Sequence, residues 1–132
     1  MKLRPGVLVS QPYPADLLAA LATEATVIAP ADAHSSLGAA ELRRHAGELI
    51  AIINQGELPL DHELLAAAPG LRIVASASIG VNNLPLEAMR ARAIWGTNTP
   101  DAFAEATADC TLGLLVMLAR RLGEGDRYVR AG

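Results

Sequence analysis

The chain has 132 residues, of which 52% are hydrophobic and 19% are charged, and its formal net charge is −3 at pH 7. That length allows one domain with its own core, or one domain and the start of another. Lys2 is the only lysine, so the basic footprint of a nucleic-acid-binding protein is absent. The most apolar stretch, residues 112–119, is too short to span a bilayer. A single cysteine, Cys110, excludes an internal disulfide and is typical of the reducing cytoplasm, where we expect this protein.

Short apolar segments alternate with helical patterns over the first 70 residues. The run Leu49-Ile50-Ala51-Ile52-Ile53 is the clearest buried strand, because five apolar residues follow one another without alternation. Asp61 is placed to cap a helix with its side chain. Strands are predicted at residues 7–9, 25–28 and 49–53, and helices at residues 16–23, 39–46 and 61–68.

Residues 71–100 continue the alternation around a turn rich in Ser, Gly and Asn. We predict a strand at 72–75, the turn at 76–83, a helix at 86–92 and a strand at 93–96. Strands that alternate with helices indicate βαβ units and a parallel sheet. The sequence therefore predicts an α/β fold with five parallel strands.

A long helix is predicted from residue 102 to residue 128, and its middle is apolar nearly all round. One domain cannot bury all of its large apolar side chains, which predicts self-association. These side chains include Leu114, Leu115, Met117 and Leu118. We expect Cys110 to be buried in this helix as a small hydrophobic residue. The change of character places a domain boundary at residues 98–100.

The best candidate site is Ser78-Ile79-Gly80, which follows a predicted strand. Ligands bind at the carboxyl ends of parallel strands, and consecutive backbone N–H groups there can hold a carboxylate. An ordinary turn in which Gly80 needs a positive φ is an equally good interpretation. Asn82 and Asn83 are expected to hold the turn rather than to touch a ligand.

A second polar segment, Asn54-Gln55-Gly56, follows the third predicted strand. It forms either a second wall of the same crevice or a simple polar turn. His34, His45 and His62 show no ligand spacing, so we expect no metal site and solvent-exposed histidines. The sequence contains neither G-x-G-x-x-G nor a P-loop motif.

Residues 71–132 resemble the D-isomer-specific 2-hydroxyacid dehydrogenases, and most closely their glyoxylate/hydroxypyruvate/2-ketogluconate reductase branch. The resemblance is carried by the Ser78-Ile79-Gly80 turn, by Thr97-Asn98-Thr99-Pro100, and by a helix that begins Glu105-Ala106-Thr107-Ala108-Asp109 and reaches Ala119-Arg120-Arg121. Residues 1–70 match the family in layout and weakly in sequence. The turn departs from the family pattern at Val81, Asn82 and Pro85, where the family has an aromatic residue, Asp and Asp.

The resemblance implies a flavodoxin-like (Rossmann-like) sheet with helices on both faces. Residues 1–98 would form an incomplete substrate-binding domain, and residues 99–132 the hinge and first long helix of a coenzyme-binding domain. The backbone of Ser78, Ile79 and Gly80 would hold the substrate carboxylate. Asn54 and Gln55 would lie in a loop that helps to set substrate choice. Thr107 would lie near the nicotinamide of NAD or NADP.

In this family the dinucleotide motif and the catalytic Arg, Glu and His follow the position that corresponds to Gly132, and a C-terminal segment completes the substrate domain. The family reaction is hydride transfer from NAD(P)H to a 2-keto acid. We therefore expect the N-terminal part of such an enzyme, with no catalytic residue, inactive and without tight cofactor binding by itself. A small 2-keto or 2-hydroxy acid substrate and a homodimer are expected. The alternative is a non-enzymatic flavodoxin-like module for binding or self-association.

Overall fold

The computed structural model describes residues 4–56 and 58–132. The chain divides into two compact units, Met1–Thr99 and Pro100–Gly132. The strands are β1 (Gly6–Val9), β2 (Thr26–Ile28), β3 (Leu49–Asn54), β4 (Ile73–Ser76) and β5 (Trp95–Thr97). The helices are α1 (Ala15–Ala22), α2 (Ala39–His45), α3 (His62–Ala67), α4 (Leu86–Ala91), α5 (Ala104–Ala119) and α6 (Leu122–Ala131). Each element predicted before residue 98 is present, with its ends within two residues of the expected positions.

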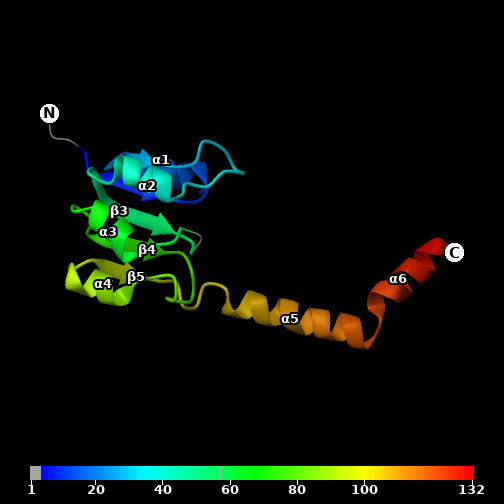
Figure 1. Cartoon of the computed structure of the whole chain (residues 1–132). Helices are drawn as coiled ribbons and strands as arrows, with labels where there is room; N and C mark the ends of the chain where they lie inside the picture. The colour runs from blue at the N-terminus through cyan, green and yellow to red at the C-terminus, as the bar shows by residue number, and fades with distance from the viewer. Residues whose placement is uncertain (1–3, 57) are drawn as a thin grey trace. The chain divides into compact units, whose positions relative to one another are not determined.

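The first unit is built on a parallel five-stranded sheet in the order β2-β1-β3-β4-β5. This order is that of flavodoxin-like folds, so the predicted fold class is confirmed. The strand arrows in Figure 1 point in one direction, so all carboxyl ends meet at one edge of the sheet. Asn54 pairs with Ser76 in the register of β3 and β4, which places these two polar residues side by side at that edge.

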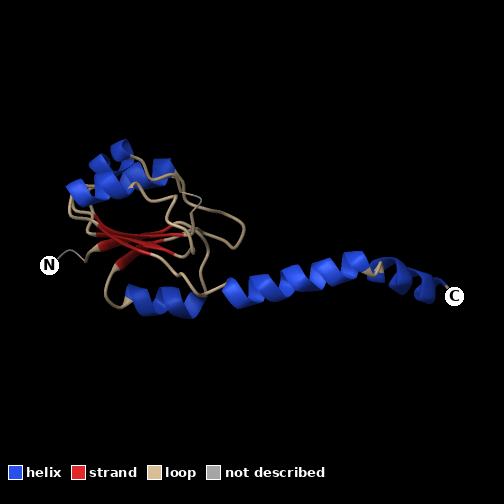
Figure 2. Ribbon diagram, turned by 90° about the horizontal axis from the view of Figure 1, so that it is seen from below, coloured by secondary structure: helices blue, strands red, loops and turns tan. Residues whose placement is uncertain are grey.

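Helices cover both faces of the sheet (Figure 2). On one face, Leu42 of α2, Leu65 of α3 and Met89 of α4 join the main core cluster. They pack there with strand residues such as Leu8 and Ile52, both 0% exposed. Because these strands are covered from both sides, their sequences are nearly continuous apolar runs rather than alternating ones.

The other face carries a smaller cluster, in which Val7 and Val9 of β1 pack with Leu18 and Leu21 of α1. Trp95 lies on this face as well, through the pairing of β5 with β4, but its side chain is 76% exposed. Within the described residues of the first unit, α1 therefore covers the β1 end of this face and leaves β5 open.

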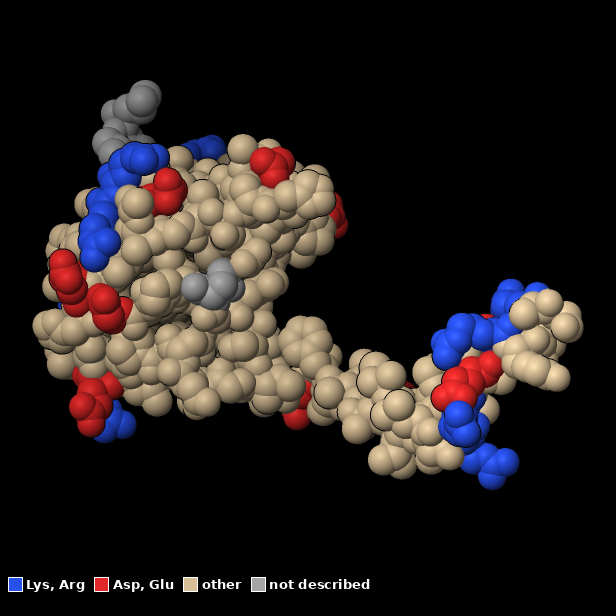
Figure 3. All heavy atoms as spheres, turned by 45° about the vertical axis from the view of Figure 1, so that its right-hand side comes forward, with Lys and Arg blue, Asp and Glu red and all other residues tan. Residues whose placement is uncertain are grey.

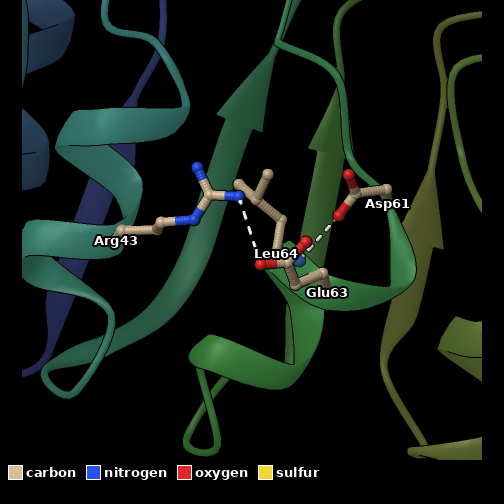
Figure 4. Close-up of polar contacts among 4 residues, drawn as sticks. All are labelled: Arg43, Asp61, Glu63 and Leu64. Carbon is tan, nitrogen blue, oxygen red and sulfur yellow. Dashed lines mark hydrogen bonds and ion pairs between the residues drawn. The ribbon is translucent and has the colours of Figure 1, made fainter.

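Asp61 caps α3 as the sequence predicts. Its carboxylate accepts a hydrogen bond of 2.7 Å from the backbone N–H of Leu64 (Figure 4). An ion pair of 3.7 Å between Arg43 and Glu63 also joins α2 to α3. Both side chains of that pair are substantially exposed, so its contribution to stability is less than about 1 kcal/mol.

The second unit corrects the prediction of one continuous helix. The helix is broken between α5 and α6, where Arg121 adopts a left-handed conformation with φ of 52°. Gly123 and Gly125 lie two and four residues further on, and their low helix propensity lowers the cost of interrupting the helix here. Charged residues gather on α6, whereas α5 is mostly uncharged (Figure 3).

Cys110 is exposed, which corrects the expectation that α5 buries it. The reason is that the second unit consists only of α5 and α6 and packs no other element against this part of the helix. Large apolar side chains are exposed for the same reason, with Leu115 at 63% and Leu118 at 78%. Among the described residues, no helix is both long and apolar enough to cross a membrane.

Candidate functional site

Three neighbouring strands end in buried polar side chains. Ser10 follows β1, Asn54 ends β3 and Ser76 ends β4, and their exposures are 0%, 0% and 2%. Buried polar groups require hydrogen-bond partners, and here they find them in one another and in the loops above them. The Ser10 hydroxyl donates to the Asn54 side-chain oxygen at 3.3 Å. The carboxyl edge of the sheet is therefore a polar layer that supports the loops leaving it.

Asn54 holds the loop that follows β3. Its side-chain oxygen accepts from the N–H groups of Gly56 and Leu58 at 3.1 and 3.2 Å, and its side-chain nitrogen donates to the Leu58 carbonyl at 3.0 Å. Gly56 needs its glycine, because its φ is 108°. Gln55, in contrast, is exposed. Of the two predicted loop residues, Asn54 is thus a buried support and Gln55 faces outward.

Side chains of Ser76, Ser78 and Asn83 hold the turn after β4 in place through hydrogen bonds. The Ser76 and Ser78 hydroxyl groups lie 2.7 Å apart, and the Asn83 side-chain nitrogen donates to the Ser76 hydroxyl at 3.2 Å. The predicted structural role of Asn83 is therefore confirmed. Asn82 is exposed and makes no side-chain hydrogen bond within the described residues.

Every carbonyl of the Ser78-Ile79-Gly80 turn accepts a hydrogen bond. The Ser78 carbonyl accepts from the Thr99 N–H at 2.9 Å, and the Ile79 carbonyl accepts from the Asn98 side-chain nitrogen at 2.8 Å. The Ser78 hydroxyl donates to the Gly80 carbonyl at 3.0 Å. The negative ends of these peptide dipoles are therefore occupied by the protein itself.

The N–H groups of the same three residues donate to no described residue. Ile79 is 44% exposed, Gly80 is exposed as well and Ser78 is partly buried, so the turn lies largely at the surface. A turn whose acceptors are occupied and whose donors are free presents positive partial charge outward, which suits an anion. No hydrogen bond or ion pair in the described chain joins this turn to Lys or Arg, so an anion at this turn would be bound by backbone N–H groups.

Gly80 does not adopt a positive φ, which corrects the interpretation that the turn needs glycine for its conformation. A Cβ atom added to Gly80 would also meet nothing within 4 Å. Neither conformation nor packing inside the chain therefore requires glycine at this position. Close approach of a ligand to the backbone remains as a physical reason for it.

A hollow of about 300 Å³ lies beside this network. Gly56 lines it from the loop after β3, and Asn82 and Asn83 line it from the loop after β4. A larger hollow of about 530 Å³ is lined by His62 and the α4 region and includes none of the strand ends. The smaller hollow is the better candidate for part of the site, because it adjoins the polar layer.

The predicted cofactor-binding residue belongs to the second unit of the chain. Thr107 is an exposed residue of α5 in the second unit, where its carbonyl accepts from the Thr111 hydroxyl at 2.7 Å. A single exposed helix without a glycine-rich strand-to-helix turn does not fit a nicotinamide dinucleotide. No group of three potential metal ligands occurs among the described residues.

Sequence reasoning missed the contacts of Asn98 and Thr99 with the turn, although both residues belong to the motifs that carry the resemblance. The available signal was the flavodoxin-like fold that the resemblance implies, because its strand order makes β4 and β5 neighbours. Residues that follow β5 lie beside residues that follow β4 when those strands are neighbours.

Comparisons with known proteins agree with the resemblance. Residues 7–123 match the family model described as "D-isomer specific 2-hydroxyacid dehydrogenase, catalytic domain". Glyoxylate/hydroxypyruvate reductase HPR3 of Arabidopsis thaliana is 42% identical over 89 residues, which make up 67% of this chain and 28% of that protein.

Solved structures give the same result. The TT0316 protein from Thermus thermophilus is similar with a TM-score of 0.79 and 38% identity, over 96% of this chain and 40% of that one. A 2-hydroxyacid dehydrogenase from Ketogulonicigenium vulgare Y25 matches with a TM-score of 0.79 and 28% identity, over 98% of this chain and 40% of that one. The chain thus spans well under half the length of these relatives. With the family model matched over most of its residues, the chain belongs to the D-isomer specific 2-hydroxyacid dehydrogenase family.

Proposed function

We propose that this chain is the N-terminal, substrate-binding part of an NAD(P)-dependent reductase of small 2-keto acids, of the glyoxylate or hydroxypyruvate type. The Ser78-Ile79-Gly80 turn binds the substrate carboxylate through its backbone N–H groups. The observation that supports the proposal is the pairing pattern of this turn, in which three carbonyls accept hydrogen bonds and three N–H groups donate to no residue that the structure describes. Relatives named as glyoxylate and hydroxypyruvate reductases support the choice of acid.

The loop after β3 contributes to substrate choice. Gln55 is exposed there and is available to a ligand, whereas Asn54 acts by holding the loop in place. The hollow between this loop and Asn83 gives room for the part of the substrate beyond its carboxylate. Residues up to 98 form the substrate-binding domain, and Thr107 lies on the first helix of the coenzyme-binding domain.

The chain by itself does not turn over substrate and does not bind NAD or NADP tightly. Its residues include no dinucleotide motif, and none of its histidines makes a hydrogen bond with the turn among the described residues. The complete enzyme uses NAD or NADP, which supplies the hydride when bound. The exposed sheet face at Trp95 supports the proposal that the chain is part of a longer protein, because another segment of that protein could cover it. We place the protein in the cytoplasm.

Self-association as a homodimer is part of the proposal. The exposed apolar side chains of α5 support it, because a stretch of that length on a monomer marks an interaction surface. Light scattering of the purified chain should give twice the mass of 13.8 kDa. Leu115→Glu should shift the mass toward that of the monomer. A monomeric mass for the unchanged protein at high concentration would refute this part.

The central test is a titration of the ¹⁵N-labelled chain, followed by two-dimensional NMR. Glyoxylate, and oxamate as an unreactive mimic of a 2-keto acid, should shift the amide resonances of Ser78, Ile79 and Gly80. The dissociation constant should be about millimolar, as a few charge-assisted hydrogen bonds allow. Acetamide, which has no carboxylate, is the control and should leave the resonances unchanged.

The outcomes separate the two functions under consideration. Selective shifts at the turn support a carboxylate site, whereas a chain that self-associates without responding to either acid would be a non-enzymatic module. An assay of NADH and NADPH oxidation with glyoxylate and hydroxypyruvate completes the test. We expect no turnover by the 132-residue chain, and turnover by a longer protein that contains it.

A further inference from the structure

One side chain controls a peptide group of the proposed carboxylate site without facing the ligand. The Ile79 carbonyl and the Gly80 N–H belong to the same planar peptide unit, and they point in opposite directions. Asn98 donates its side-chain amide to that carbonyl at 2.8 Å. Fixing the carbonyl therefore also fixes the direction in which the Gly80 N–H points.

The other peptide groups of the turn are held by different means. The Ser78 carbonyl, which shares its peptide unit with the Ile79 N–H, is held by the backbone of Thr99. The Gly80 carbonyl is held by the Ser78 hydroxyl from within the turn. Asn98 is thus the only side chain from outside residues 76–83 that the described structure places on a carbonyl of the turn.

Asn98 contributes little to the core. It is exposed and lies just after β5, and its side chain makes no other hydrogen bond within the described residues. One hydrogen bond at the surface adds little to the stability of the fold, so a role in stability alone does not explain this contact. A role in polarising and orienting a peptide group needs only that contact, because hydrogen bonds in a chain strengthen one another.

We propose that Asn98 is a positioning residue for the substrate carboxylate, acting through the Ile79–Gly80 peptide. This inference rests on the proposed function, since it assigns a support to the same anion site. Asn98 holds the Gly80 N–H in the direction of the ligand and makes that N–H a better donor. Loss of the Asn98 amide should weaken carboxylate binding and leave the fold intact.

The test compares Asn98→Ala with Thr97→Ala in the oxamate titration. Thr97 is a matched control, because it is the exposed polar neighbour of Asn98, makes no side-chain hydrogen bond among the described residues and does not line the hollow beside the turn. Asn98→Ala should raise the dissociation constant for oxamate about three- to tenfold, the effect of one hydrogen bond. Thr97→Ala should change it less than about twofold. Asn98→Gln, which keeps an amide donor, should recover part of the affinity.

A second measurement needs no variant. In the unchanged chain, oxamate should shift the ¹³C resonance of the Ile79 carbonyl and the side-chain amide resonances of Asn98. A merely structural residue would not respond in this way. Equal affinities for Asn98→Ala and Thr97→Ala, or Asn98 resonances that do not shift during binding, would overturn the inference and leave the carboxylate site standing. No amide shifts at all in the unchanged chain would overturn both.

Discussion

Replacing Asn54 by alanine should destabilise the first unit strongly, because its side chain holds together the buried polar layer at the strand ends. Its side chain is 0% exposed and makes four hydrogen bonds, with the Ser10 hydroxyl, the Gly56 N–H and both backbone groups of Leu58. Alanine removes all four at once. The variant tests whether the polar layer at the strand ends is necessary for stability.

The size of the loss in stability depends on which buried polar groups have no hydrogen-bond partner once the Asn54 side chain is removed. Leu58 is only 1% exposed, so water has little access to its N–H and carbonyl groups once Asn54 is gone. A buried polar group without a partner costs about 1–3 kcal/mol. Gly56 is exposed and regains water at little cost. The expected loss in the free energy of unfolding is therefore about 3 kcal/mol, with most of it arising at Leu58.

Urea unfolding followed by circular dichroism measures this loss, with Asn82→Ala as the control. Each kcal/mol corresponds to about 4–8 °C in melting temperature for a domain of this size, so the variant should melt more than about 10 °C lower. The control should stay within about 0.5 kcal/mol of the unchanged chain. A loss below about 1 kcal/mol for Asn54→Ala would show that the loop finds other partners, and would refute the reasoning.

Four further outcomes are expected. Asp61→Ala should lower the free energy of unfolding by about 1 kcal/mol, because it removes the cap on the Leu64 N–H, and an unchanged urea midpoint would contradict this. Gly80→Ala should leave stability unchanged or raise it by up to about 1 kcal/mol, since φ is ordinary and the added methyl group meets nothing. The same variant should weaken oxamate binding, and unaltered affinity would argue against close approach of the ligand. The fluorescence of Trp95, the only tryptophan, should be quenched by iodide almost as efficiently as in the urea-unfolded chain, because its side chain is 76% exposed, and strong protection would mean that something covers β5.

The sheet could be predicted because each strand carries its signal locally. The run from Leu49 to Ile53 is apolar throughout, which is typical of a strand covered on both faces. The start of β5 was placed two residues early because Ala93 and Ile94 are apolar like a strand. In the structure these residues close α4 instead, with the Ile94 N–H donating to the Met89 carbonyl and Ala93 at a φ of 52°.

The break in the last helix shows the opposite case. Apolar periodicity runs through α5 and predicted continuation, whereas the left-handed Arg121 is a single-residue event. Gly123 and Gly125 were the available warning, since two glycines close together lower helix propensity by about 2 kcal/mol relative to alanine. The apolar periodicity thus predicts where the helix lies, but it does not predict the break at Arg121.

The candidate site likewise has one property that the sequence predicts and one that it does not. Its location could be predicted, because carboxyl ends of parallel strands share an edge and Ser78-Ile79-Gly80 follows one of them. The pairing of its backbone groups could not be predicted, because it depends on which residues distant in the sequence lie within hydrogen-bond reach of each N–H and carbonyl. The bond from Asn98 to Ile79 spans 19 residues and exists only because β5 lies beside β4.

A chain with a net charge of −3 can still hold an anion if the donors are backbone amides. Amides carry only partial charges, so they need no counter-ion when the site is empty, and the turn is stable without a ligand. The strength of such a site depends on how firmly the donors are oriented, since backbone donors are effective when preorganised. In this chain the orientation is supplied by Thr99 and Asn98 on one side and by Ser76 and Asn83 on the other. Substitution of Asn98, Ser76 or Asn83, which act through their side chains, should therefore weaken anion binding, even though none of these changes adds or removes a charge.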